Sequence, residues 1–474
     1  MEKPRKARNL LLVPSLLLII LLSGCSLPGQ SSNASNITPL ALTPTPSHGA
    51  AATSTPTTTV SSGDWTTYHQ NSSRTGYVAN APDPTRLGRA WSKDLDGAVY
   101  AEPLVVGGRV IVATEGNSLY AFADKTGKLL WKTNVGRPVP QSSLPCGNID
   151  PLGITGTPVY DPATGLVFAV AEISGPAHVL VGLDIATGVV KVRRGVDISG
   201  MDPTPHQQRA ALALGNGMVY IAYGGLDGDC GQYRGTVVAA RTDGTGNLLS
   251  FRVPTPREGG IWAPPGPAID SQGKLYVAVG NGAVTAGNWD HSDSILRLSP
   301  TLRLEDGFAP SNWADENASD ADLGSMGPIL VPGGLIYANG KGSRGYVLKT
   351  ANLGGVGGQV SDISLCTAFG GAAALGSQVF VPCISGLREI KISQAGQITT
   401  GWQAPSNIQG SPIVGGHTVY DLDIHGTLYA LNSSTGSVRA SISVGDVNRF
   451  ATPTLADNML FVGTYAGIVA VTLS

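Results

Sequence analysis

The feature that most constrains the fold of this chain is a unit of about 40 to 60 residues that repeats eight times. Each unit starts at Pro or Ala, runs through short apolar residues, turns at Gly or Asn, and enters a second apolar run, as from Pro103 to Val112. Such self-similarity predicts a repeat architecture. The starting residues are Pro103, Pro158, Ala211, Pro267, Pro328, Ala372, Pro412 and Pro453.

The apolar runs favour strands over helices. They are 3 to 5 residues long, end at Gly, Pro, Asn or Asp, and show no sustained period of 3.6 residues. The high count of 63 Gly and the low charged fraction of 14% argue against a helical bundle or coiled coil. Eight four-stranded units predict an all-β fold, an eight-bladed β-propeller. A pair of β-sandwiches is the alternative, but it does not explain eight equivalent units.

The two ends of the repeat region predict how the ring closes. The eighth unit, from Pro453 to Ser474, has room for only three strands. The segment 87–95 resembles the last strand of a unit, as found at 129–133. We therefore expect this N-terminal strand to complete the last blade, which removes an exposed sheet edge.

The string at residues 121–131 (Ala-Phe-Ala-Asp-Lys-Thr-Gly-Lys-Leu-Leu-Trp) carries a family resemblance. It resembles the tryptophan-docking motif of the pyrroloquinoline-quinone (PQQ) repeat propellers, Ala-x-Asp-x-x-Thr-Gly-Lys-x-x-Trp, with the Asp shifted by one place. Weaker copies lie at 183–188 and 430–436. The resemblance covers residues 64–474 and implies that Trp91, Trp131 and Trp402 pack between blades. The chain is similar both to quinoprotein alcohol dehydrogenases and to non-catalytic propeller lipoproteins.

The resemblance also implies a cofactor site. Quinoprotein dehydrogenases bind PQQ and Ca²⁺ over the propeller axis, and a carboxylate takes the proton of the alcohol. In blade order, this sequence offers Glu172, Asn281, Asp320 and Asp322 as metal ligands, with Asp320 also as the catalytic carboxylate. Lys341 resembles the basic residue that faces the quinone oxygens. Oxygen ligands of this kind suit Ca²⁺.

Each of these residues also has a structural interpretation. Asn281 can be a turn residue with positive φ, Asp320 and Asp322 can solvate a loop, and Glu172 can lie on a surface loop. Trp262 either faces the axis or packs the top of a blade. Two motifs of many such enzymes are absent from the sequence: the adjacent Cys-Cys pair that stacks on the quinone and the Cys-x-x-Cys-His haem motif.

Four cysteines of the repeat region are predicted to form disulfides, because an even number in an exported chain favours pairing. Cys366 and Cys383 flank one hairpin, so we pair them, which leaves Cys146 with Cys230. The alternative is four free buried thiols.

The N-terminus has the features of a targeting signal. A basic head precedes the apolar run 10–22, which is too short to span a bilayer. The string Leu22-Ser23-Gly24-Cys25 resembles a bacterial lipobox, which implies lipidation of Cys25, palmitate included, and an anchor on the extracytoplasmic face of the cell membrane. An ordinary signal peptide is the alternative. Residues 26–63 lack Asp, Glu, Lys and Arg and predict a disordered Ser/Thr/Pro tether. The expected parts are therefore 1–25, 26–63 and 64–474.

The sequence leaves three functions open and favours the first. A formal net charge of −2 gives no general attraction to nucleic acid. One function is a membrane-anchored binding or scaffold propeller that has no cofactor and binds an unknown protein or small molecule. The second is a PQQ- and Ca²⁺-dependent alcohol or sugar dehydrogenase that passes electrons to a separate carrier. A third, by likeness, is a role in outer-membrane protein assembly.

Overall fold

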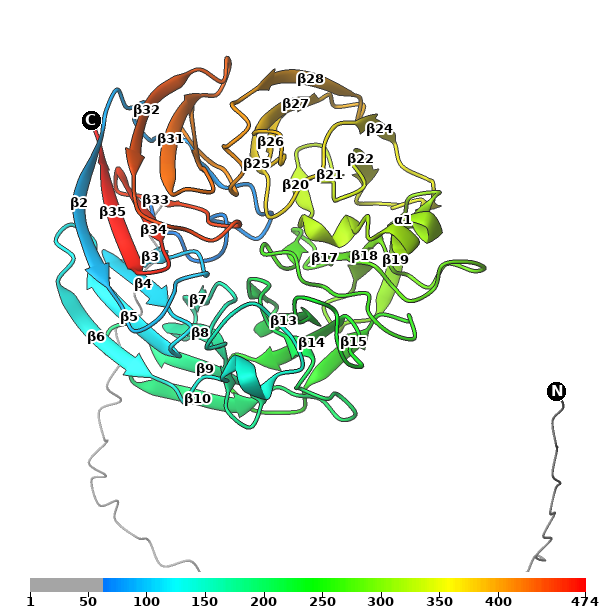
Figure 1. Ribbon diagram of the computed structural model, residues 1–474, viewed down its shortest axis with the longest axis horizontal. Coiled ribbons are helices and arrows are strands. Elements are labelled where there is room, and N and C mark those ends of the chain that lie inside the picture. The colour runs from blue at the N-terminus through cyan, green and yellow to red at the C-terminus, as the bar shows by residue number, and fades with distance from the viewer. Residues whose placement is uncertain (1–62) are drawn as a thin grey trace, which may run out of the picture. The chain divides into compact units, whose positions relative to one another are not determined.

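Short apolar strands separated by glycine turns form eight antiparallel sheets around a central axis in the computed structural model, which describes residues 63–474 (Figure 1). Most blades use consecutive strands, with the first strand innermost and the last outermost, and blade 8 takes its outermost strand from the N-terminal side of the repeat region (Figure 1). The predicted eight-bladed β-propeller is therefore confirmed.

The first four blades come from the first half of the ring. Blade 1 contains β3 (Leu104–Val106), β4 (Arg109–Ala113), β5 (Ser118–Ala123) and β6 (Leu129–Asn134); blade 2 contains β7 (Val159–Asp161), β8 (Leu166–Ile173), β9 (Ala177–Asp184) and β10 (Val190–Gly195). Blade 3 contains β12 (Ala213–Gly215), β13 (Met218–Gly225), β14 (Thr236–Arg241) and β15 (Leu249–Arg252), with β11 (His206–Gln207) beside β13. Blade 4 contains β16 (Ala268–Ile269), β17 (Leu275–Val279), β18 (Ser294–Leu298) and β19 (Leu304–Ala309), with β23 (Gly355–Val356) beside β19.

The other four blades complete the circle. Blade 5 contains β20 (Ile329–Val331), β21 (Leu335–Ala338), β22 (Arg344–Lys349) and β24 (Ser361–Ser364); blade 6 contains β25 (Ala373–Leu375), β26 (Gln378–Val381), β27 (Arg388–Ile392) and β28 (Ile398–Gln403). Blade 7 contains β29 (Ile413–Gly415), β30 (Thr418–Leu422), β31 (Thr427–Asn432) and β32 (Val438–Ser443), with β1 (Tyr77–Val78) beside β29. Blade 8 contains β33 (Thr454–Ala456), β34 (Met459–Gly463), β35 (Gly467–Leu473) and β2 (Leu87–Asp94). The helices found between residues 63 and 474 are α1 (Trp313–Ser319) and the short η1 (Gln141–Ser143) and η2 (Leu323–Ser325).

The N-terminal strand closes the last blade as expected. Strand β2 pairs antiparallel with β35, from Leu87 opposite Leu473 to Asp94 opposite Gly467. In Figure 1 the blue β2 lies beside the red β35. The two ends of the repeat region thus share one sheet, which leaves no unpaired edge at the junction.

The predicted tryptophan docking explains how three pairs of blades pack. The indole Nε1 of Trp91 donates to the Asp124 carbonyl of the next blade (2.7 Å), and that of Trp131 donates to the Ile185 carbonyl (3.0 Å). A Cβ at Gly127 would lie 2.6 Å from the Trp91 ring, and Gly127 has a φ of +64°. Glycine in the Thr-Gly turn is therefore needed both for the backbone conformation and for the space that the indole occupies. Trp402 docks in the same way on the next blade.

An N-terminal segment inside the ring was not predicted. Residues 65–76 contact the inner strands of successive blades: the carbonyls of Thr66, Ser73 and Thr75 accept hydrogen bonds from blades 2, 5 and 6. The fully buried Arg74 donates to the carbonyls of Leu212 and Pro267, in blades 3 and 4. This segment therefore ties blades together from within and fills part of the axial channel.

Both predicted disulfides are present, Cys146–Cys230 and Cys366–Cys383. Within residues 63–474, no helix is long and apolar enough to cross a bilayer. Cys25 and nearly all of the predicted tether lie outside the described residues.

Candidate functional site

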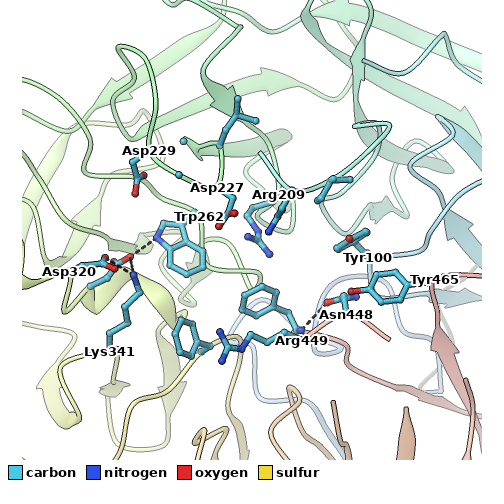
Figure 2. Close-up of a pocket in the computed structure, with 18 residues that line it drawn as sticks. Tyr100, Arg209, Asp227, Asp229, Trp262, Asp320, Lys341, Asn448, Arg449 and Tyr465 are labelled. Carbon is cyan, nitrogen blue, oxygen red and sulfur yellow. Dashed lines mark hydrogen bonds and ion pairs between the residues drawn. The ribbon is translucent and has the colours of Figure 1, made fainter. Parts of the chain in front are cut away.

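Loops within and between the blades surround a cavity of about 570 Å³ on one face of the ring (Figure 2). Its walls come from blades 1, 3, 4, 5, 6 and 8, so the cavity lies over the central axis. A second cavity of about 470 Å³ shares Asp229, Trp262, Asp320 and Asp322 with it. The labelled residues of Figure 2 are Tyr100, Arg209, Asp227, Asp229, Trp262, Asp320, Lys341, Asn448, Arg449 and Tyr465.

Four of the residues predicted from the sequence form one cluster on this cavity pair. The Lys341 Nζ lies 2.6 Å from Asp320 Oδ1 and 3.6 Å from Asp322 Oδ2. The Asn281 Nδ2 donates to Asp320 Oδ1 at 2.6 Å. The indole Nε1 of Trp262 donates to Asp322 Oδ2 at 3.0 Å, so Trp262 faces the axis and orients this carboxylate (Figure 2).

Local backbone geometry brings these side chains together. Asn281 follows β17, and a Cβ at the preceding Gly280 would lie 2.5 Å from Asp322 Oδ1, so only glycine allows this approach. Asp320 ends α1 with a φ of +55°, a left-handed conformation that Asp tolerates. The Lys341 backbone N–H donates to the Asp322 carbonyl at 3.0 Å. Asn281 has no positive φ, unlike the turn residue of the alternative interpretation.

Burial sets the charge balance of this cluster. Burial raises the pKa of Asp322, and the Lys341 ammonium opposes that rise. Burial and the charge of Asp322 together raise the pKa of Asp293, whose side chain is fully buried behind the cluster. Burial alone lowers the pKa of Lys341, but Asp322 and Asp320 outweigh it and raise that pKa. Lys341 therefore carries its charge at neutral pH.

The oxygens of this cluster suit a hard cation. Asn281 Oδ1 and Asp322 Oδ1 are shielded from solvent and have no hydrogen-bond partner in the described part of the chain. Unpartnered buried oxygens cost free energy, and Ca²⁺ prefers carboxylate and amide oxygens. Among residues 63–474, no three His, Cys, Asp or Glu side chains are arranged to hold a metal, and Asn281 adds an amide oxygen to the carboxylate oxygens of this cluster.

Glu172 lies apart from this cluster and lines neither cavity. Its Oε1 accepts the Gln208 N–H at 2.8 Å and lies 3.6 Å from His178 Nε2. The His178 Nδ1 lies 2.6 Å from Asp197 Oδ1. Burial lowers the pKa of His178, but Glu172 and Asp197 outweigh it and raise that pKa to about 9. The structure therefore pairs Glu172 with a buried imidazolium and does not bring it to the other predicted ligands.

The opposite side of the cavity is basic and aromatic, and the sequence did not predict it. The Arg209 guanidinium lies 4.5 Å from the Phe450 ring centroid and 5.5 Å from that of Trp262. The Arg449 guanidinium lies 4.3 Å from the Phe369 centroid. One signal was available: Tyr100, Phe369 and Phe450 each stand three residues before the start of a repeat unit.

The Cys146–Cys230 disulfide joins two loops that form one wall of the cavity. The first loop contributes Asn148 and Ile149, and the second contributes residues 226–229. The Gly147 N–H also donates to the Asp227 carbonyl at 3.0 Å. The crosslink spans from the connection after blade 1 to blade 3, so it holds this wall across blade 2.

Comparisons with known proteins agree with this architecture. A family model described as outer membrane protein assembly factor BamB matches residues 81–191. A polyvinylalcohol dehydrogenase from Pseudomonas sp. is 25% identical over 242 residues, which are 46% of this chain but only 35% of that protein.

Solved structures with similar folds include dehydrogenases and an assembly factor. A quinohemoprotein alcohol dehydrogenase from Pseudomonas putida HK5 superposes with a TM-score of 0.68 at 16% identity, over 87% of this chain and 80% of that one. A europium-containing methanol dehydrogenase gives 0.67 at 16% identity, over 86% and 91%. BamB from Moraxella catarrhalis gives 0.58 at 14% identity, over 82% and 100%. This chain therefore has the PQQ-repeat propeller fold of the quinoprotein alcohol dehydrogenases, as the docking motif predicted.

Proposed function

We propose that this propeller binds a PQQ-type quinone together with a hard cation over its axis and oxidises an alcohol or sugar. The observation that carries the proposal is the cluster of Asn281, Asp320, Asp322 and Lys341 beside the Trp262 indole, at the rim of a cavity on the axis. Lys341, a hard-oxygen donor pair and an indole are the groups that such a cofactor needs. The fold similarity to quinoprotein dehydrogenases supports the proposal further.

The chain's own residues divide the work as follows. Asn281 and Asp322 would hold the cation through their unpartnered oxygens, Ca²⁺ or a lanthanide ion being the best matches. Lys341 would donate a hydrogen bond to a quinone oxygen, and Trp262 would give a flat surface for the ring. When bound, the cofactor accepts the two electrons of alcohol oxidation.

Asp320 is the best-placed proton acceptor. Its side chain is 71% exposed and lines both cavities, so it can take the hydroxyl proton of an alcohol and release it to water. The Lys341 ammonium donates a charge-assisted hydrogen bond to Asp320 Oδ1 at 2.6 Å, which holds this carboxylate in place.

The test is reconstitution of the full chain with PQQ and Ca²⁺, followed by quinone absorbance and alcohol-dependent dye reduction. We expect Asp320→Ala to retain quinone absorbance and to lower the rate at least about 100-fold, the range for removal of a general base. Asp315→Ala, an exposed carboxylate on the same helix, is the matched control and should keep full activity. Absence of quinone binding would exclude the enzyme, and equal rates in both variants would exclude Asp320 as its proton acceptor.

A binding or scaffold role is the second candidate. The observation that favours it is the pairing of Glu172 with His178, which leaves the cation site without the ligand that the family supplies from an early blade. In that role the axial cavity binds a ligand without turnover. Saturable ligand binding with no dye reduction under any donor tested would support this candidate over the dehydrogenase.

We also propose that the chain is anchored outside the cytoplasm through lipidated Cys25. The lipobox-like string before Cys25 supports this location. Mass spectrometry of the purified chain should find acyl groups on an N-terminal Cys25. A mature chain that starts elsewhere without lipid would contradict it.

A further inference from the structure

Two arginines of the axial cavity have no hydrogen-bond or ion-pair partner within residues 63–474. Neither the Arg209 nor the Arg449 guanidinium donates to any oxygen of the described chain, although both line the cavity. Arg74 shows the contrast: this buried guanidinium donates to the carbonyls of Tyr68, Leu212 and Pro267 and to the Thr67 hydroxyl. Arg74 thus stabilises the fold by donating its N–H groups to protein oxygens. Arg209 and Arg449 make no such hydrogen bonds.

Burial of Arg209 gives its unpaired N–H donors a free-energy cost. Its Nε is shielded from solvent and makes no hydrogen bond. Burial lowers the pKa of Arg209 to about 10, so the group still carries its charge at neutral pH. A shielded, charged donor without an acceptor is unfavourable unless a ligand supplies the acceptor.

Aromatic rings hold both guanidinium groups without using their donors. Arg209 lies over Phe450 and Trp262, and Arg449 lies over Phe369, at 4.3 to 5.5 Å from the ring centroids. Cation–π contact engages the face of a guanidinium and leaves its N–H edge free. The ring centroids of Phe369 and Phe450 are 6.4 Å apart, so the two arginines rest on neighbouring aromatic rings.

The carboxylates of the cavity do not neutralise these arginines. Asp227 lies close enough to influence Arg209 electrostatically, but no ion pair within 4 Å joins them. Burial raises the pKa of the nearby Glu115 to about 8, which leaves it mostly uncharged at neutral pH. Asp320 and Asp322 are engaged with Lys341. Asp320 and Asp322 of the cavity are therefore bound to Lys341, whereas Arg209, with Asp227 nearby, and Arg449 keep open donors.

We propose that Arg209 and Arg449 form a carboxylate-binding site for a small ligand that carries two or more carboxylates on a flat or apolar body. Guanidinium groups match carboxylates through paired N–H donors, and the rings of Phe369, Phe450 and Trp262 suit a flat ligand. Two ligands could supply these carboxylates: the quinone cofactor or an anionic alcohol substrate. The site rests on the open arginines alone and does not require the proposed dehydrogenase.

The first experiment measures binding of benzene-1,3-dicarboxylate to the full chain by calorimetry, with the neutral benzene-1,3-dicarboxamide as the matched probe. We expect the diacid to bind at least about 10-fold more tightly than the diamide and more weakly at high salt. Arg209→Gln and Arg449→Gln should each weaken diacid binding about 10-fold, and Arg86→Gln on the exposed rim should not. Equal affinity for diacid and diamide, or unchanged binding in the double variant, would overturn the site.

A second experiment separates the two sources. If the cofactor supplies the carboxylates, PQQ affinity followed by absorbance falls at least about 10-fold in Arg209→Gln and Arg449→Gln. If the substrate supplies them, PQQ affinity holds while KM rises for a carboxylated alcohol and stays fixed for a neutral one. Diacid binding without any dye reduction would remove the dehydrogenase and leave this site intact. If the chain binds PQQ and oxidises alcohols, variants that change neither the PQQ affinity nor the KM of a carboxylated alcohol would overturn the site.

Discussion

Two of the clusters that join carboxylates to a cation in this propeller contain residues predicted as metal ligands, and only one of these two faces the axial cavity. In the first, Glu172 and Asp197 flank His178, which is 1% exposed, and Glu172 also accepts a backbone N–H. In the second, Asp320 and Asp322 flank Lys341 beside the axial cavity. The first is largely enclosed by protein and lines neither cavity; the second has solvent-shielded oxygens without partners in the described chain. The family resemblance pointed to carboxylates in both clusters. Only the burial and the partners of each carboxylate in the structure distinguish a stabilising ion pair from a binding site.

The largest effect that separates the clusters is on stability. His178→Ala leaves Glu172 buried without its counter-charge, and breaking a buried pair in this way costs about 3 kcal/mol. Asp320→Ala, at an exposed carboxylate, should cost less than about 0.5 kcal/mol. Urea denaturation of both variants measures the difference. Equal losses would contradict the division into an enclosed and an open cluster.

The pH dependence of stability sharpens the same comparison. The folded-state pKa of His178 is about 9, above the ordinary value of about 6.5 for an unfolded histidine. The stabilisation is therefore complete below about pH 6.5 and is lost as pH rises toward 9. Denaturation midpoints of the parent chain should fall across that window. The same fall in His178→Ala would show that another group is responsible.

The open cluster should respond to pH in its own way. Lys341→Met removes the cation beside Asp322 and should cost about 1 kcal/mol at pH 7, because the Asp322 charge is buried. The loss should shrink toward pH 5 as Asp322 takes up a proton, since its pKa is already raised by burial. Lys349→Met, at an exposed position on β22, is the control and should show no such trend. A loss that grows at low pH would contradict this interpretation.

The smallest expected effect concerns Glu172 itself. Glu172→Gln should change the affinity for PQQ and Ca²⁺ by less than about two-fold, because Glu172 lines neither cavity. Asn281→Ala, which removes an unpartnered oxygen of the open cluster, should weaken Ca²⁺-dependent binding about 10-fold or more. An equal loss of affinity in both variants would show that Glu172 contributes to the cation site.

The fold was predictable because its signals are local and repeated. Each unit carries its own apolar runs and glycine turns, and Trp91 marked the strand that closes blade 8. Residues 65–76 were not predicted, because they form no repeat and their partners are inner strands of separate blades. Their position depends on the closed ring, which no local pattern describes.

The candidate site was predictable on one side only. Asn281, Asp320, Asp322 and Lys341 stand in motifs of blades 4 and 5, so the resemblance located them. Arg209 and Arg449 come from single positions in distant loops and carry no motif. The pairing of Glu172 with His178 depends on the register between β8 and β9, which places these residues opposite each other. Sequence order alone does not reveal that register.

The most direct test of the central claim is equilibrium dialysis of the full chain against PQQ, with and without Ca²⁺. The axial cluster predicts one PQQ bound per chain, dependence on the cation, and loss of both in an Asn281→Ala, Asp322→Ala double variant. No saturable binding, or binding that ignores the cation and the double variant, would contradict a quinone site at the axis.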